Sequence, residues 1–458
     1  MSKIESSTTS DTISFAPQHR GESDLFSRVI AALKQANHNL CVLHGYKNYP
    51  EGITSDSDID AISQNPEQIP QLLIEQDVAQ VVQVLQHETT AFSYILCREY
   101  EGNPALIQLD VSKDYRRNGR VFFQGKDFLS QNRPYKFFSV PKAELEFAYY
   151  LVKKLAKGAM DESQAQRLSE LYQEQPDKCD LQLKHFLPEV EAKLIAETAS
   201  SGNWQPVYED IQNLRSALLG KVGRANPLEV LHFWAGELVR IIKRIRQPTG
   251  LMVVFLGADG SGKSTAIAEI QEKLTPVFRQ TQYIHLRPKL GLGKSDNSPP
   301  VLDPHGQLPR SWLTSTLKLF YFLIDYSIGY IFQIYPQLVR STFVVFDRYY
   351  HDLLVDTRRY RYGGSNWLAK LVGWLIPQPD LWILLDAPAE VLQARKQEVS
   401  FEETARQQEA YVKLVRSLPN GYIVDASRTI EEVESEVESI VLSEMTKRTA
   451  KRLGLKNL

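Results

Sequence analysis

The sequence has few cysteines and almost no net charge. Its 458 residues include only three cysteines, Cys41, Cys97 and Cys179, which are widely spaced and odd in number. No CxxC or Cys/His cluster is present, so the sequence supports neither a disulfide framework nor a zinc site and favours a reducing cytoplasm. The formal net charge of −2 gives no indication of a nucleic-acid partner.

A leader peptide and a clear membrane span are also missing. Residues 1–20 are rich in Ser and Thr without an apolar core, so we expect a disordered start. The most apolar stretch, residues 317–339, is long enough to cross a bilayer, but it carries Asp325, Gln333 and Pro336. A charge near the centre of a span is costly, so we expect a buried, aromatic-rich helix and no stable membrane insertion.

The pattern along the chain divides into three folded regions and a tail. Residues 21–135 mix strands and helices, including an expected helix over 79–85, and residues 136–247 read as helices alone. Residues 248–446 alternate apolar strands with helices, which predicts a parallel sheet wrapped by helices. Residues 447–458 form a basic tail.

A phosphate-binding loop opens the third region. The segment Gly257-Ala-Asp-Gly-Ser-Gly-Lys263-Ser264 follows an apolar strand and precedes a helix. Glycines at this spacing let backbone amides close around phosphate oxygens at a helix N-terminus. Lys263 is expected to contact the β- and γ-phosphates of ATP, and Ser264 to bind Mg²⁺. The nucleotide-contacting set expected from this loop is Gly257, Gly260, Ser261, Gly262, Lys263, Ser264 and Thr265.

A charged pair follows a later strand of the same region. The apolar strand ending at Phe346 leads into Asp347 and Arg348. In open parallel sheets the carboxyl ends of the strands hold the ligand. A carboxylate at that edge suits Mg²⁺ or its waters, and an arginine can neutralise charge on a transferred phosphoryl group, so both are candidate catalytic residues.

Together, GADGSGKST, FDRYY, PDLWILLDAP and IVDAS resemble the motifs of the thymidylate kinase-like family, in order and spacing. The resemblance covers about 195 residues. It implies a P-loop kinase fold that uses ATP and Mg²⁺. It implies that Asp259 faces the acceptor and that Arg348 holds the acceptor phosphate. It also implies that Arg395, with Arg406 near it, belongs to a lid over ATP. Asp425 and Ala426 would lie near the adenine.

The sequence departs from that family where the base is recognised. The thymine-recognising Ala-Tyr-Gln of the family is replaced here by HDLLVDTRRYRYGG. The arginines Arg358, Arg359 and Arg361 in this segment favour a strongly anionic acceptor, because guanidinium groups match phosphate oxygens; a solvated charged loop is the alternative. We therefore expect thymidylate to be a poor acceptor.

An acidic pattern marks the first region. Asp58 and Asp60 are two residues apart on a predicted strand and face the same side, and Asp110 lies within a later strand. Three carboxylates on adjacent strands would hold Mg²⁺. Together with His44-Gly45, this pattern resembles the polymerase-beta-like nucleotidyltransferase superfamily. Tyr46 replaces the Gly or Ser that contacts the incoming phosphate in that superfamily.

The predicted fold class is α/β multidomain. It combines a nucleotidyltransferase-like α+β domain, a helical connector and a parallel-sheet P-loop domain. The predicted function is ATP-dependent phosphorylation of a nucleotide or other phosphorylated small molecule. The sequence leaves two alternatives open: a bifunctional kinase and nucleotidyltransferase that makes activated sugars or polysaccharide precursors, and a regulatory ATPase with a vestigial acceptor site. It also leaves a homodimer open.

Overall fold

The computed structural model describes residues 20–455 except 118, 222–226, 289–307 and 398. The expected disordered start and most of the loop between His285 and Pro309 therefore lie outside the described residues. Contacts divide the chain into two compact units. One holds the residues up to Trp234 apart from Val82–Leu85, and the other holds Val82–Leu85 and the residues from Ala235 onward. The three-domain division made from the sequence stays a prediction.

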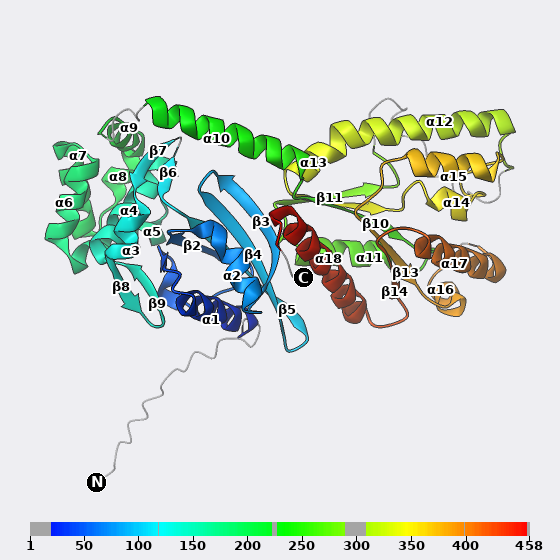
Figure 1. The fold of residues 1–458 in the computed structure, drawn as a ribbon, viewed down its shortest axis with the longest axis horizontal. Coiled ribbons are helices and arrows are strands. Elements are labelled where there is room, and N and C mark those ends of the chain that lie inside the picture. The colour runs from blue at the N-terminus through cyan, green and yellow to red at the C-terminus, as the bar shows by residue number, and fades with distance from the viewer. Residues whose placement is uncertain (1–19, 118, 222–226, 289–307, 398, 456–458) are drawn as a thin grey trace, which may run out of the picture. The chain divides into compact units, whose positions relative to one another are not determined.

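The first unit is built on a seven-stranded mixed sheet with the order β3-β4-β5-β2-β1-β9-β8 (Figure 1). Strand β2 runs parallel to β5 and antiparallel to β1. A small separate hairpin pairs β6 with β7. The strands are β1 (Leu40–Val42), β2 (Asp58–Ser63), β3 (Gln80–Glu88), β4 (Ala91–Tyr100), β5 (Asn103–Ser112), β6 (Tyr115–Arg117), β7 (Arg120–Phe123), β8 (Asn132–Tyr135) and β9 (Phe138–Pro141).

One element of this unit differs from the expectation. The segment expected as a helix over 79–85 is strand β3, so that prediction is wrong. Val81, Val82 and Val84 are β-branched and lose side-chain freedom in a helix. Because five consecutive residues from Val81 to Leu85 are buried, the segment shows no polar face that would have marked a strand by alternation.

Helices complete the first unit. Helix α4 contacts α5, α6 and α9, and its buried face includes Phe147, Leu151 and Leu155. These helices share a compact unit with the sheet. The expectation of helices alone over 136–247 is wrong at its start, because Phe138–Pro141 forms strand β9 and pairs with β1, whereas from Ala143 to Lys221 the elements are all helices. The helices are α1 (Arg20–Gln35), α2 (Ile69–Glu75), α3 (Gly125–Ser130), α4 (Ala143–Lys157), α5 (Glu162–Glu174), α6 (Pro176–Phe186), α7 (Glu189–Ser201), α8 (Gln205–Glu209) and α9 (Ile211–Lys221). Helix α10 (Pro227–Arg246) then leads from one unit into the other.

The second unit contains the predicted parallel sheet, in the order β11-β12-β10-β13-β14. Every neighbouring pair in it is parallel, which confirms the α/β expectation for this region. Strands β10, β12 and β13 are apolar and almost completely buried, as expected for strands covered on both faces. The strands are β10 (Leu251–Leu256), β11 (Gln280–His285), β12 (Thr342–Asp347), β13 (Leu381–Asp386) and β14 (Gly421–Asp425).

Helices cover this sheet and carry part of the site. Helix α11 follows the phosphate-binding loop and contacts α18, whereas α12 contacts α15 (Figure 1). A π-helical turn, Tyr330–Ile334, joins α12 to α13. The basic residues expected as a tail mostly extend α18. The helices are α11 (Lys263–Lys273), α12 (Trp312–Gly329), α13 (Tyr335–Val339), α14 (Asp352–Val355), α15 (Asn366–Leu375), α16 (Ala389–Arg395), α17 (Phe401–Arg416) and α18 (Ile430–Leu453).

Helix α12 is buried on one face only. Leu319, Phe322 and Tyr326 are buried, but Phe320 and Ile324 are each more than half exposed. Within the part of the chain that the structure describes, the stretch Trp312–Val339 is the one helix with the length and composition of a membrane span, and 33% of its most apolar window is buried. The expectation of a buried helix is therefore wrong for its outer face.

A buried histidine, His351, follows strand β12. His351 stacks on Tyr349, and its ring centroid lies 4.6 Å from that of Trp382. Burial lowers the pKa of His351 from 6.5 to about 4. The folded state therefore binds this proton less readily than the unfolded state, so stability is fully present above about pH 6.5 and falls as the pH drops towards 4.

Between about pH 7.5 and about pH 5, this histidine alone is expected to remove about 2 kcal/mol from the free energy of unfolding. Urea unfolding of the chain at the two pH values should show the loss. The variant His351→Gln should show a correspondingly smaller loss. Equal pH dependence in the two proteins would contradict the prediction.

Candidate active site

The phosphate-binding loop joins β10 to α11 and depends on its glycines. Gly257, Gly260 and Gly262 have φ of 146°, 87° and 84°, a region that side chains with a Cβ rarely adopt. A Cβ at Gly257 would lie 2.6 Å from the carbonyl oxygen of Leu385 on the neighbouring strand. The sequence motif therefore corresponds to a backbone shape that only glycine provides.

Lys263 lies folded into this loop. Its Nζ donates to the carbonyl oxygens of Gly257 and Ala258, at 2.8 and 2.9 Å, and to Ser261 Oγ at 3.3 Å. Burial, followed by the charge of Arg348, lowers the pKa of Lys263 to about 8. A buried cation ringed by backbone dipoles favours an anionic ligand, because the ligand would compensate the cost of burying the charge.

Asp347 is the last residue of β12 and lies beside the loop. It is 6% exposed and pairs in register with Phe255 of β10 and His285 of β11. Tyr283 donates to its Oδ2 at 3.1 Å, while its Oδ1 is buried without a hydrogen-bond partner among the described residues. Burial alone would raise the pKa of Asp347, but the His285 contact and the charges of Lys263 and Arg348 outweigh it and lower the pKa. The carboxylate is therefore held ionised.

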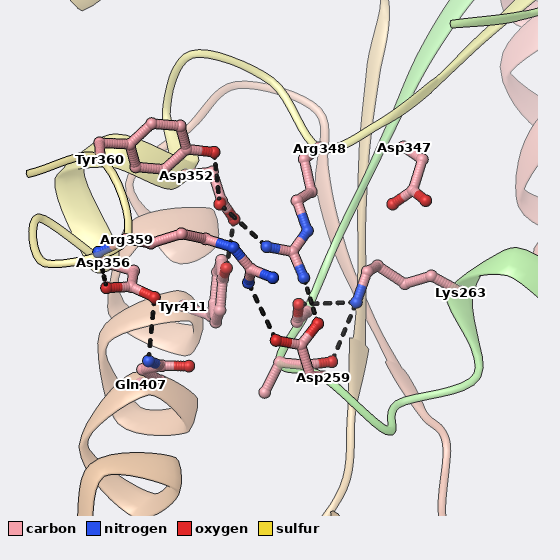
Figure 2. A network of polar contacts seen from close by, with 12 residues as sticks. Asp259, Lys263, Asp347, Arg348, Asp352, Asp356, Arg359, Tyr360, Gln407 and Tyr411 are labelled. Carbon is pink, nitrogen blue, oxygen red and sulfur yellow. Dashed lines mark hydrogen bonds and ion pairs between the residues drawn. The ribbon is translucent and has the colours of Figure 1, made fainter. Parts of the chain in front are cut away.

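Arg348 and Arg359 converge on Asp259 (Figure 2). Arg348 has φ of 68°, which is unusual for a residue with a Cβ, and its guanidinium donates to Asp259 and, at 3.4 Å, to Asp352. Arg359 donates to Asp259 Oδ2 at 2.9 Å. Two guanidinium groups thus meet next to the phosphate-binding loop, each held by a carboxylate.

A second layer of polar groups fixes these arginines. Asp352 is fully buried and accepts from Tyr360 at 2.8 Å and from Tyr411. Asp356 accepts the backbone N–H of Arg359 at 2.9 Å and Nε2 of Gln407 at 3.2 Å. The sequence analysis missed both aspartates. The available signal for Asp352 was its spacing of four residues from Arg348, and Asp356 follows after four more, since residues i and i+4 of a helical turn are neighbours.

These groups surround one cavity of about 540 Å³. It brings together Lys263, Ser264, Asp347, Arg348 and Asp259, which the sequence had placed in one site. Of the three arginines Arg358, Arg359 and Arg361, only Arg359 lines this cavity. The full lining is Asp259, Gly260, Gly262, Lys263, Ser264, Thr265, His285, Leu286, Asp347, Arg348, Arg359, Tyr360 and Lys396.

A second cavity, of about 250 Å³, lies on the other side of the loop. Ala426 and Arg395 line it together, and Arg395 Nη1 donates to the carbonyl oxygen of Ala426 at 2.9 Å. Asp425 is exposed and turns back to accept from Ser427, so its side chain does not line this cavity. Arg406 donates to Val355 and Glu403 rather than towards the loop. The remaining lining is Gly260, Ser261, Gly262, Thr265, Ala266, Leu385, Arg428, Ile430 and Val433.

Comparison with known proteins relates part of this unit to one protein family. Residues 255–437 match the thymidylate kinase family model. These residues form a thymidylate kinase-like domain. A probable thymidylate kinase of Pyrobaculum aerophilum is 26% identical over 205 residues, which cover 41% of this chain and 95% of that protein. A thymidylate kinase of Marinomonas sp. is 27% identical over 204 residues, covering 41% and 92%. A crystal structure of thymidylate kinase from Ehrlichia chaffeensis aligns with a TM-score of 0.30 at 18% identity, covering 42% of this chain and 99% of that one.

The thymidylate kinase-like domain contains groups that fit Mg²⁺. Asp347 offers a buried, ionised carboxylate whose Oδ1 has no hydrogen-bond partner in the described part of the chain, and Ser264 lines the same cavity. Oxygen ligands of this kind suit Mg²⁺. The donor set therefore fits the ion that the family uses with ATP.

The acidic residues of the first unit are brought onto neighbouring strands. Asp60 of β2 pairs in register with Asp110 of β5, and Asp58 lies two residues before Asp60. Lys153 Nζ and His44 Nε2 lie 2.8 and 2.9 Å from Asp60 Oδ2. Burial, followed by the negative charges of Asp60 and Asp58, raises the pKa of Asp110 to about 6, although a hydrogen bond from Gln108 Nε2 at 3.2 Å opposes the shift.

Two features bear on a metal at these carboxylates. Lys153 already supplies positive charge beside Asp60, and the described residues contain no group of three His, Cys, Asp or Glu side chains placed to hold a metal ion. Tyr46 is buried, donates to Glu146 and is contacted by Arg167 at 3.2 Å, so its hydroxyl belongs to the core. The family model matches residues of the thymidylate kinase-like domain, and the nucleotidyltransferase assignment of the first unit stays a prediction.

Proposed function

We propose that the chain is an ATP-dependent kinase that phosphorylates a nucleotide or another small molecule already carrying a phosphate. The observation that carries the proposal is the single cavity in which Lys263 of the phosphate-binding loop faces Arg348 and Arg359. Two clusters of cations on one cavity suit two anionic substrates better than one. A nucleotidyltransferase-like first unit remains part of this proposal, supported by the register of Asp60 and Asp110.

The donor side is built from the loop and Lys263. The N–H groups of the loop and the start of α11 point at the position of the β- and γ-phosphates, and the helix N-terminus adds its partial positive charge. On binding ATP, Lys263 exchanges its bonds to the Gly257 and Ala258 carbonyls for phosphate oxygens. The apolar second cavity next to the loop, with Ala426 and Arg395, is the proposed position of the adenine.

The acceptor side is built from Arg348, Arg359 and Asp259. The two arginines bind the acceptor's existing phosphate, and Asp259, which pairs with both, holds them next to each other and orients them before the acceptor arrives. An oxygen of the acceptor phosphate then attacks the γ-phosphorus of ATP, the bond to the β-phosphate oxygen breaks, and ADP leaves. The arginines neutralise charge on the transferred group. Bound Mg²⁺ would neutralise phosphate charge, and Ser264 and Asp347 would hold it.

A direct assay tests the proposal. The full chain is incubated with ATP, Mg²⁺ and a panel of nucleoside monophosphates and sugar phosphates, and products are identified by mass spectrometry. Appearance of one diphosphate with equimolar ADP supports the kinase. ADP release with no phosphorylated acceptor would contradict it and favour the regulatory ATPase.

Variants of Arg359 and Arg358 can distinguish a direct contact with the acceptor from the general effect of positive charge near the cavity. Arg359 lines the cavity, whereas Arg358 is exposed outside it. Arg359→Met is expected to raise the KM for the acceptor about 10- to 100-fold, because a hydrogen bond to a charged group contributes about 1.5–3 kcal/mol. The KM for ATP should change little. Arg358→Met is the matched control, and an equal effect of both variants on the acceptor KM would show that Arg359 acts only through net charge.

Thymidylate is expected to be a poor acceptor. The segment that would recognise thymine in the family is occupied here by α14 and by the loop that carries Arg359. A site that lacks the partners of a base loses the discrimination those partners provide. Comparing kcat/KM for dTMP with that of the best acceptor in the panel checks this, and selective phosphorylation of dTMP would show the prediction wrong.

A further inference from the structure

The outer face of α12 is more apolar than a solvent-facing surface requires. Seven residues between Trp312 and Gly329 are exposed, and Thr314 is the only one of them that is not hydrophobic. Leu313, Leu317, Phe320 and Ile324 recur at spacings of three and four, so they form one stripe along the helix. Surface helices of globular domains normally turn such a stripe inwards. This helix turns one stripe inwards and another outwards.

Helix α15 packs against α12 and shows the same feature. Trp367, Leu371 and Trp374 follow one another at spacings of four and three, and they are 67%, 43% and 78% exposed. Two neighbouring helices of one unit, drawn in yellow and orange in Figure 1, therefore each carry an uncovered apolar stripe. Contiguous apolar surface of this kind marks an interaction site. We call the exposed apolar residues of α12 and α15 the α12–α15 face.

The exposed charges on these two helices, and at the described residues just outside the ends of the α12–α13 segment, all have one sign. The only acidic residue in 312–340 and 366–375, all of which the structure describes, is Asp325; it is buried and paired with Arg287 at 2.8 Å. Lys370 lies exposed on α15, and Arg310 and Arg340 are exposed just outside the two ends of the α12–α13 segment. Aromatic residues and cations without an exposed anion match an anionic lipid surface, where the rings enter the headgroup region and the cations meet phosphates.

We propose that the α12–α15 face binds the surface of an anionic lipid bilayer, with α12 lying on the membrane rather than crossing it. The inner face of α12 supports this orientation, because Tyr326 lies 4.7 Å from Tyr349 and Phe322 lies 6.2 Å from Tyr350, ring centroid to ring centroid. These contacts tie the helix to the core of its unit. A second copy of the chain is a less suitable occupant. A two-fold interface brings the same surface onto itself, and this face has no carboxylate to meet Lys370.

The face also adjoins a loop of the proposed acceptor site. Ser315 Oγ of α12 accepts from the Gly363 backbone at 3.0 Å, and Lys318 Nζ donates to the Tyr360 carbonyl at 2.7 Å. The element proposed to bind lipid is thus the one that holds the segment following Arg359. The proposal stands on the surface alone and does not depend on the kinase activity.

Vesicle flotation with the full chain tests the proposal. Vesicles of phosphatidylcholine alone are compared with vesicles of phosphatidylcholine and phosphatidylglycerol in equal parts. The chain is expected to float with the anionic vesicles and to dissociate as salt rises, since surface charge is screened. The variants Leu317→Ser/Phe320→Ser and Trp367→Ser/Trp374→Ser should each weaken vesicle partitioning at least about tenfold, because each removes two large apolar side chains from the interface.

A matched control uses apolar residues that are equally exposed elsewhere. Leu181 and Val190, on α6 and α7 of the other unit, are 67% and 78% exposed, and Leu181→Ser/Val190→Ser should float as the unaltered chain does. Quenching of tryptophan fluorescence by brominated lipid should be reduced in the Trp367→Ser/Trp374→Ser variant, which keeps only Trp312 on this face. Failure of the unaltered chain to float with anionic vesicles would overturn the proposal. A dimer in sedimentation equilibrium that the same variants dissociate, without vesicle binding, would assign the face to a second copy.

Discussion

Lys263→Ala is expected to lower the rate of phosphoryl transfer by at least about 10³-fold while leaving the chain folded. The ammonium is 7% exposed and bonded to the carbonyls of Gly257 and Ala258, so it is already positioned where the β- and γ-phosphates would lie. Removing it deletes charge compensation that grows as the γ-phosphoryl group moves. Steady-state ADP release with a saturating acceptor measures the loss.

Lys273 provides the matched control for that variant. It lies at the last turn of the same helix, α11, and pairs with Glu434 at 2.8 Å outside the cavity. Lys273→Ala should retain transfer close to that of the unaltered chain, and circular dichroism should show the same helix content for both variants. Near-normal turnover by Lys263→Ala would contradict the kinase assignment itself.

Arg348→Met is expected to reduce kcat/KM for the acceptor by about 10²–10³-fold, as the loss of one preorganised charged donor typically does. Its guanidinium is 6% exposed and held between Asp259 and Asp352, and its pKa is raised because these carboxylates outweigh the effect of burial. It is therefore a permanent cation in a fixed place. The effect should fall on kcat as well as on KM if the group also stabilises the transferred phosphoryl.

The variant Arg348→Lys distinguishes geometry from charge. It keeps the positive charge but cannot reach Asp259 and Asp352 together, so most of the activity should still be lost. Thermal unfolding and ATP binding provide the structural control, because Asp352 keeps the hydroxyl donors of Tyr360 and Tyr411 in both variants. Full activity of Arg348→Lys would show that position matters less than charge.

The sequence predicted most of the residues that meet around the first cavity, because the information there is local. The glycines at 257, 260 and 262 indicate positive φ within a loop, and Asp347 ends an apolar strand that Arg348 follows directly. The arginine-rich segment was harder. Which of its arginines enters the cavity depends on how Asp356 and Gln407, more than fifty residues apart, fix the loop. That is a tertiary contact that a single sequence does not display.

Burial explains two of the expectations that were wrong. Strand β3 lacks alternation because both of its faces are covered, so its apolar run reads equally well as a helix. The apolar segment 317–339 was expected to be a buried helix because Asp325 makes a membrane span costly, yet one face of α12 is open. A hydrophobic surface is expected to be covered, but its hydrophobicity does not indicate whether the same domain or another molecule covers it.

The two aspartates behind the acceptor arginines connect the two substrate positions through one helix. Helix α17 supplies Tyr411 to Asp352 and Gln407 to Asp356, and it follows α16, whose Arg395 lines the second cavity. Binding of an acceptor that displaces Arg348 and Arg359 is therefore expected to displace α17 as well. Helix α16, which lines the second cavity, directly precedes α17 in the chain. Thermodynamic linkage makes such coupling reciprocal. If bound acceptor changes the affinity for ATP by some factor, bound ATP changes the affinity for the acceptor by the same factor.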